Sequence, residues 1–137
     1  MPSIFTRIID GEIPGHFVWT DDRCVAFLSI NPITAGHAIV VPRAEIDHWL
    51  DLDPDLAAHL MVVARAVGLA QQRAFSAPRV GLEIAGFEVP HCHLHVLPIW
   101  GEEDLHLSRS ARSVENEELV ANATFIRNAL GELGLTP

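Results

Sequence analysis

Apolar and polar positions along this chain follow two different periods, and the change of period separates predicted helices from predicted strands. Helical spacing predicts three helices: a short one over the apolar positions 4–9, which Gly11 and Pro14 end, a long one over residues 54–75, and a C-terminal one ending near Gly131 or Gly134. Short apolar runs bounded by turn residues predict five strands: 17–20, 24–30, 37–41, 79–84, and a last one inside the apolar run 89–100, ending at Pro98.

The predicted order is helix, three strands, long helix, two strands, helix. Hairpin-type turns such as Asp21-Asp22 are short, which favours antiparallel pairing of neighbouring strands. The pattern therefore predicts an α+β domain, a mainly antiparallel sheet with the long helix packed on it, plus a C-terminal helix. Residues 101–116 are polar and carry no strong period.

Three histidines stand at alternate positions within the last predicted strand: His91, His93 and His95. In a strand their imidazoles lie on one face, while Cys92, Leu94 and Val96 face the other way. A single buried histidine is most often a hydrogen-bonded core residue, but three on one face are costly without a ligand. This strand is therefore predicted to carry chemistry or a metal.

Two functions suit such a row of imidazoles. Neutral histidines bind zinc or iron, and His37, Glu83 or Glu88 could supply a further ligand. Alternatively, one imidazole attacks phosphorus while its neighbours position it and neutralise the phosphate oxygens. The spacing alone does not choose between metal binding and covalent catalysis.

Composition narrows the class of protein. A chain of 137 residues predicts one domain, and 49% hydrophobic residues exclude a mainly disordered chain. The net charge of −9 argues against a nucleic-acid binder, although local donors can still hold one small phosphorylated ligand. No apolar stretch approaches the roughly 20 residues of a membrane span, and residues 1–7 lack the features of a secretory signal. A cytoplasmic protein with two buried free thiols, Cys24 and Cys92, is expected.

Four segments occur in an order that resembles one known family: IFTRIIDGEIP at 4–14, DDRCVAF at 21–27, NPITAGH at 31–37 and HCHLHVLP at 91–98. Together they are similar to the histidine triad (HIT) family, and to its Hint-like branch more than its Fhit-like branch. The resemblance covers roughly residues 3 to 98. It implies a HIT-like catalytic domain over 1–100. Residues 101–137 are not covered by the resemblance, and their pattern predicts a C-terminal extension, a polar loop and helix, in the same globular unit.

The resemblance implies a hydrolase or transferase that acts on the α-phosphorus of a nucleoside-monophosphate conjugate, such as a phosphoramidate. His93 would attack and form a nucleotidyl-histidine intermediate, which water then cleaves. His95 would donate to the phosphate oxygens, and His91 and His37 would orient the nucleophile's surroundings. The implied ligand is a purine nucleoside monophosphate or its conjugates, with no cofactor, and the implied assembly is a homodimer. An apolar cleft for the base would be formed by Ile4, Phe5, Ile8, Phe27 and Ile30.

The chain departs from the family's pattern in its polar residues. Ser29 stands where an aspartate commonly holds the ribose, and Phe87 and Glu88 stand where glutamine and a hydroxyl residue commonly precede the triad. Glu88 could act as a general acid, repel a dianionic substrate or point into solvent. The asparagine common on the preceding strand is not evident in residues 80–84. The positions of the zinc ligands that some relatives carry read Ser3, Thr6 and Glu45, so no metal site is expected there.

The sequence leaves two alternatives to the enzyme. The chain could be a nucleotide-binding module with little or no turnover, because of Ser29 and Glu88. It could also hold a metal on His91, His93 and His95, although the resemblance makes this the weaker alternative.

Overall fold

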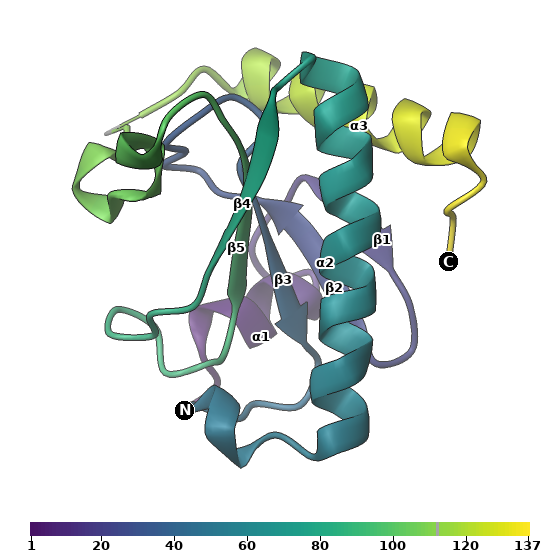
Figure 1. Cartoon of the computed structure of the whole chain (residues 1–137). Coiled ribbons are helices and arrows are strands. Elements are labelled where there is room, and N and C mark those ends of the chain that lie inside the picture. The colour runs from purple at the N-terminus through teal and green to yellow at the C-terminus, as the bar shows by residue number, and fades with distance from the viewer. Residues whose placement is uncertain (112) are drawn as a thin grey trace.

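The computed structural model describes residues 1–111 and 113–137. Its helices and strands, in chain order, are α1 (Ile4–Ile9), β1 (Phe17–Thr20), β2 (Cys24–Leu28), β3 (Ala38–Pro42), α2 (Pro54–Phe75), β4 (Arg79–Glu83), β5 (Leu94–Ile99) and α3 (Asn116–Leu133). The predicted α+β class and the predicted order of elements are confirmed (Figure 1).

Local chemistry explains where the helices begin and end. Ser3 caps α1, because its hydroxyl accepts the Thr6 N–H at 3.1 Å. Pro54 occupies the first turn of α2, and Ser76 ends that helix in the left-handed region with φ 52°. Gly134 ends α3 in the same region with φ 68°.

The five strands form one antiparallel sheet in the order β1-β2-β3-β5-β4. Strand β5 therefore lies between β3 and β4, which brings residues from both halves of the chain together. Ile39 of β3 is paired with His95 of β5, and Glu83 of β4 is paired with the same histidine. Strands β1 and β4 are the two edges.

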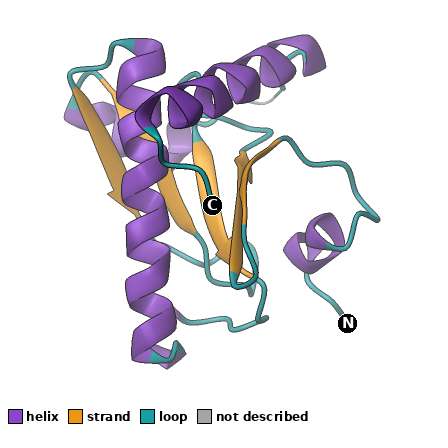
Figure 2. Ribbon diagram, turned by 90° about the vertical axis from the view of Figure 1, so that its right-hand side faces the viewer, coloured by secondary structure: helices purple, strands orange, loops and turns teal. Residues whose placement is uncertain are grey.

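The two faces of the sheet are covered by different helices. Helices α2 and α3 pack against each other and against one face, and their contact with the sheet forms the larger core. Gly68 lets α2 approach the sheet closely, since a Cβ there would lie 3.2 Å from Val80. Helix α1 lies on the other side of the strands (Figure 2), over a smaller apolar cluster. No helix among the described residues is long and apolar enough to cross a membrane.

Several strand ends differ from the predictions. Strand β2 ends at Leu28 and β4 at Glu83, each earlier than predicted, and β3 runs one residue later. Strand β5 begins only at Leu94, so His91 and His93 precede it. The reason lies in the backbone donors: Pro90 has none, the His91 N–H turns back to the Val89 carbonyl at 2.8 Å, and the Cys92 N–H bonds the Ile46 carbonyl at 2.7 Å.

The predicted alternation nevertheless extends through this irregular segment. Cys92, Leu94 and Val96 belong to the larger core beneath α2. The three imidazoles lie on the opposite side, where the rings of His91 and His93 contact Phe5 of α1. The polar segment after residue 100 contains two 3-10 turns, Glu102–Leu105 and Leu107–Arg109.

Candidate functional site

A chain of hydrogen bonds fixes the protonation of His95. The Ile33 N–H donates to Nδ1 of His37 at 3.1 Å, so the proton of neutral His37 is on Nε2. That nitrogen lies 2.9 Å from Nδ1 of His95 and donates to it. Nε2 of His95 therefore carries the proton of that ring and is available as a donor.

The neighbouring ring, His93, has the opposite arrangement. Its Nδ1 lies 2.8 Å from the His91 carbonyl, which only accepts, so the proton is on Nδ1. Nε2 of His93 is left with an unprotonated lone pair. The ring centroids of His93 and His95 are 4.9 Å apart, so a ring with a bare Nε2 and a ring with a donor Nε2–H are neighbours.

Burial keeps all three of these histidines neutral. It lowers the pKa of His37 to about 3 and that of His95 to about 4, and nearby imidazoles add to both effects. Burial also lowers the pKa of His93, against the opposing effects of its bond to the His91 carbonyl and the charge of Glu88. A neutral His93 is an unprotonated nucleophile at neutral pH.

His91 is tied to the N-terminal helix. Its Nε2 donates to the Pro42 carbonyl at 2.7 Å, so Nδ1 accepts the Ser3 hydroxyl at 2.6 Å. Glu45 accepts the Ser3 N–H at 2.6 Å and the Thr6 hydroxyl at 2.8 Å, and these bonds lower the pKa of its carboxyl. Both ring nitrogens of His91 are thus occupied, and the triad does not present three free imidazole nitrogens to a cation.

An apolar cluster adjoins the histidines on the α1 side. Phe5 packs edge-on against Phe27 and His93, with ring centroids 5.7 and 4.8 Å apart. Of the residues predicted for a base cleft, Phe5, Phe27 and Ile8 belong to this cluster. Ile4 and Ile30 are exposed and do not.

The polar residues singled out in the sequence lie around the same histidines. Ser29 follows β2, and its N–H bonds the His37 carbonyl at 3.0 Å while its hydroxyl accepts the Asn31 N–H. Glu88 is exposed in the segment before the triad, close enough for its charge to affect His93. Glu83, which the sequence suggested only as a metal ligand, lies opposite His95 on β4.

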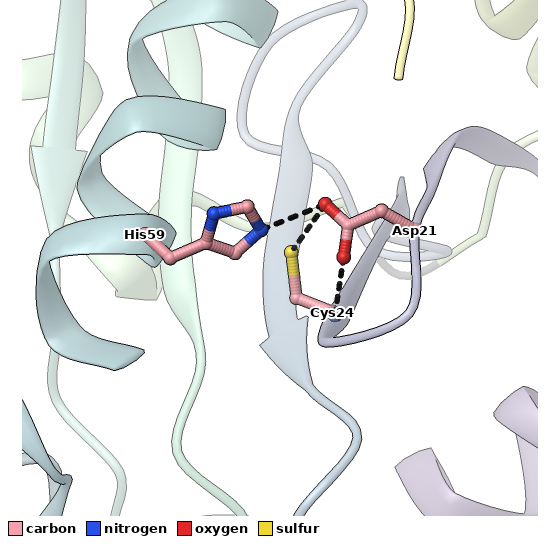
Figure 3. Close-up of side chains that lie close together, drawn as sticks. All are labelled: Asp21, Cys24 and His59. Atoms are coloured by element: carbon pink, nitrogen blue, oxygen red, sulfur yellow. Dashed lines mark hydrogen bonds and ion pairs between the residues drawn. The ribbon is translucent and has the colours of Figure 1, made fainter. Parts of the chain in front are cut away.

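A second cluster lies away from the triad, where the β1–β2 turn meets α2 (Figure 3). Asp21, Cys24 and His59 place their ligand-type atoms within 4.8 Å of one another, the one such group among the described residues. Oδ2 of Asp21 accepts from Trp19 and His59, each at 2.8 Å, and lies 3.6 Å from the Cys24 thiol. No local pattern in the sequence links positions 21 and 59, so the sequence alone did not indicate this cluster.

The chemistry of this second cluster favours a structural role. Oδ1 of Asp21 accepts the backbone N–H groups of Arg23 and Cys24, so every oxygen is already bonded. Burial and the charge of Asp21 raise the pKa of the Cys24 thiol to about 12, which keeps it protonated. We interpret the cluster as a clamp between the turn and α2.

Comparison with known proteins places this arrangement in a family. A HIT domain model matches residues 10–100. An uncharacterized HIT-like protein of Saccharolobus solfataricus is 34% identical over 73% of this chain and 76% of its own length. Protein hit of Bacillus subtilis is 32% identical over 74% of this chain and 73% of its own.

Solved structures agree with the fold. A HIT-like protein from Bartonella henselae superposes with a TM-score of 0.82 at 27% identity, covering 93% of this chain and 95% of that one. A hypothetical histidine triad nucleotide-binding protein from Sulfolobus tokodaii gives 0.80 at 28% identity, covering 94% and 92%.

Proposed function

The chain belongs to the HIT family, and from that premise we propose that it cleaves nucleoside-monophosphate conjugates at the α-phosphorus through a nucleotidyl-His93 intermediate. The HIT-like domain over residues 1–100 carries this chemistry, and residues 101–137 complete the same globular unit. The observation that supports the proposal most strongly is the pairing of a bare Nε2 on His93 with a protonated Nε2 on His95.

The two nitrogens suit the two halves of a displacement at phosphorus. The lone pair of His93 forms a bond to phosphorus while the phosphorus–nitrogen bond of a phosphoramidate breaks. The departing amine keeps that electron pair and takes a proton from solvent. The His95 N–H donates to a phosphate oxygen as negative charge develops there. Water then attacks phosphorus, loses a proton to solvent, and displaces His93.

The surroundings of His93 support a nucleoside as the other half of the substrate. Ile8, a partly exposed member of the apolar cluster, offers aliphatic surface to a flat base, and the buried rings of Phe5 and Phe27 support it from within the core. We infer that a purine nucleoside monophosphate or its conjugate binds with its base there. Ser29, a neutral residue beside the His37 strand, would provide the ribose contact.

The proposal is tested by intact-protein mass after rapid mixing with adenosine 5'-phosphoramidate. We expect a transient added AMP that maps to His93, followed by AMP in solution. Absence of both the adduct and AMP release over hours, at high protein concentration, contradicts the enzyme. If AMP still raised the melting temperature under those conditions, a nucleotide-binding module would replace the enzyme, with Ser29 and Glu88 as the residues that depart from the family's pattern.

We also propose that the chain forms a homodimer through β4 and α2. Leu82 on the edge strand β4 is 42% exposed and Met61 on α2 is 54% exposed, and both line one groove with Leu69 and Val80. Open strand edges beside apolar surface are typical of sites that pair with another chain. A two-fold axis places β4 and α2 of one protomer against β4 and α2 of its partner, so a second copy of the chain fits this groove.

Leu82→Glu is therefore expected to convert the dimer to a monomer in light scattering coupled to size exclusion. The charge would be buried without a partner at the interface. Val120→Glu is the matched control, because Val120 is similarly exposed, at 47%, but lies on α3. A wild-type monomer at the highest attainable concentration, or a dimer that persists in the Leu82 variant, excludes this interface.

A further inference from the structure

The groups on the α1 side of the sheet lie in a definite order. The apolar cluster is built from β2, β3 and α1, and Phe5 of this cluster contacts His93. His93 contacts His95 on β5. Strand β4 follows β5 at the edge, and its residue opposite His95 is Glu83. The order is therefore apolar cluster, His93, His95, Glu83.

The side of the sheet on which Glu83 lies follows from its neighbour. Leu82 is paired with Val96, and both line the groove beside α2. Side chains alternate along a strand, so Glu83 is on the opposite face, together with His95. Directly opposed residues have their Cβ atoms about 5 Å apart, so Glu83 and His95 are cross-strand neighbours on this face.

Glu83 has an unused acceptor. Its Oε2 is buried and has no hydrogen-bond partner among the described residues. Among the described residues, the carboxylates that form ion pairs with arginine are those of Glu12, Glu132 and Asp104, not that of Glu83. The chain has no lysine, so apart from histidine only its nine arginines could pair with a carboxylate. A buried carboxylate oxygen without a donor is costly, and a donor supplied by a ligand removes that cost.

The proposed reaction, on which this inference rests, decides which part of a substrate reaches Glu83. With the base in the apolar cluster and the phosphorus at His93 and His95, the remaining substituent is the leaving group. In an in-line displacement it departs from the side opposite His93. The base occupies the Phe5 side of His93 in this arrangement, so we place the leaving group on the side of His95 and β4. We propose that Glu83 forms a leaving-group subsite selective for amines that carry a second, positively charged nitrogen.

The charge of Glu88 acts in the same direction. It is exposed in the segment that joins β4 to the triad and stabilises positive charge at His93. A carboxylate in this region disfavours an anionic leaving group such as a second phosphate. The leaving group is therefore selected in two ways: Glu83 attracts an ammonium, and the charge of Glu88 repels an anion.

The test compares three adenosine 5'-phosphoramidates of nearly equal length, with a terminal ammonium, a terminal methyl and a terminal carboxylate on the leaving amine. The readout is kcat/KM for AMP release. We expect the ammonium compound to exceed the methyl compound by about tenfold, the size of one charge-assisted contact, and the carboxylate compound to fall below both. The ratios are expected to shrink as salt is added.

Glu83→Gln is expected to bring the ammonium-to-methyl ratio to about one, because the amide keeps the shape and loses the charge. The ratio is measured within one variant, so a smaller folded fraction does not alter it. Glu117→Gln, at an exposed position of α3, controls for the change in net charge.

The possible outcomes separate the inference from the reaction itself. Equal rates for the three compounds in the wild type, or a preference that survives Glu83→Gln, overturn the subsite. No AMP release from any of them contradicts the proposed reaction instead.

Discussion

Replacing His93 with glutamine is expected to lower AMP release from adenosine 5'-phosphoramidate by ~10³-fold or more, the scale on which loss of a nucleophile acts. Glutamine fills a similar volume, but its amide has no nitrogen lone pair that can attack phosphorus. The apolar cluster and the His95 N–H are untouched by this change. AMP should therefore still bind, which calorimetry with AMP as the titrant measures.

The control for this variant is His106→Gln, since His106 is an exposed histidine outside the triad. It is expected to keep the wild-type rate. A His93 variant that retains more than a tenth of the activity would mean that water attacks directly, with the histidines only binding phosphate. That result would remove the covalent intermediate from the mechanism.

Asp21→Asn is expected to lower the free energy of unfolding by about 3 kcal/mol, the scale on which a partly buried charged acceptor with several donors acts. The wild-type carboxylate accepts two backbone N–H groups together with Trp19 and His59. An asparagine has one acceptor oxygen, so several donors lose their partner. Urea unfolding at pH 7 measures the difference, with Asp22→Asn as the control because Asp22 is adjacent and exposed.

The difference in the free energy of unfolding between wild type and Asp21→Asn is expected to depend on pH. Burial alone would raise the pKa of Asp21, but the hydrogen bonds from Trp19, Arg23, Cys24 and His59 hold it well below 3.8. A carboxyl with a lowered pKa in the folded state contributes its full stability above the unfolded value. The advantage of wild type over Asp21→Asn should therefore be constant above about pH 5 and shrink below 3.8. A difference that stays constant down to pH 2 would contradict the clamp.

Local signals in the sequence were sufficient for the helices. The bounds of α2 match the prediction because Pro54 opens the helix and its apolar stripe ends at residue 75. Strand ends were less predictable, since they depend on partners distant in sequence. At the triad, the apolar run suggested a continuous strand, but Cys92 bonds the Ile46 carbonyl and the regular ladder begins only at Leu94.

For the candidate site, the alternation of histidines identified the segment, and the resemblance to the HIT family suggested which ring attacks. The protonation of each ring depends on bonds that no local pattern indicates. His37 and His95 are 58 positions apart, and the serine that orients His91 is 88 positions away. The position of Glu83 opposite His95 likewise required the register of β4 on β5.

These large sequence separations have a consequence for folding. The β3–β5 pairing and the bond between Ser3 and His91 close long loops, and the entropy of closure is lost before the contacts compensate for it. A chain still being synthesised has neither the complete ring network nor its proton arrangement until the segment after residue 90 has emerged. During refolding from urea, catalytic competence should therefore appear only with the last long-range pairing, later than the helical signal from α2.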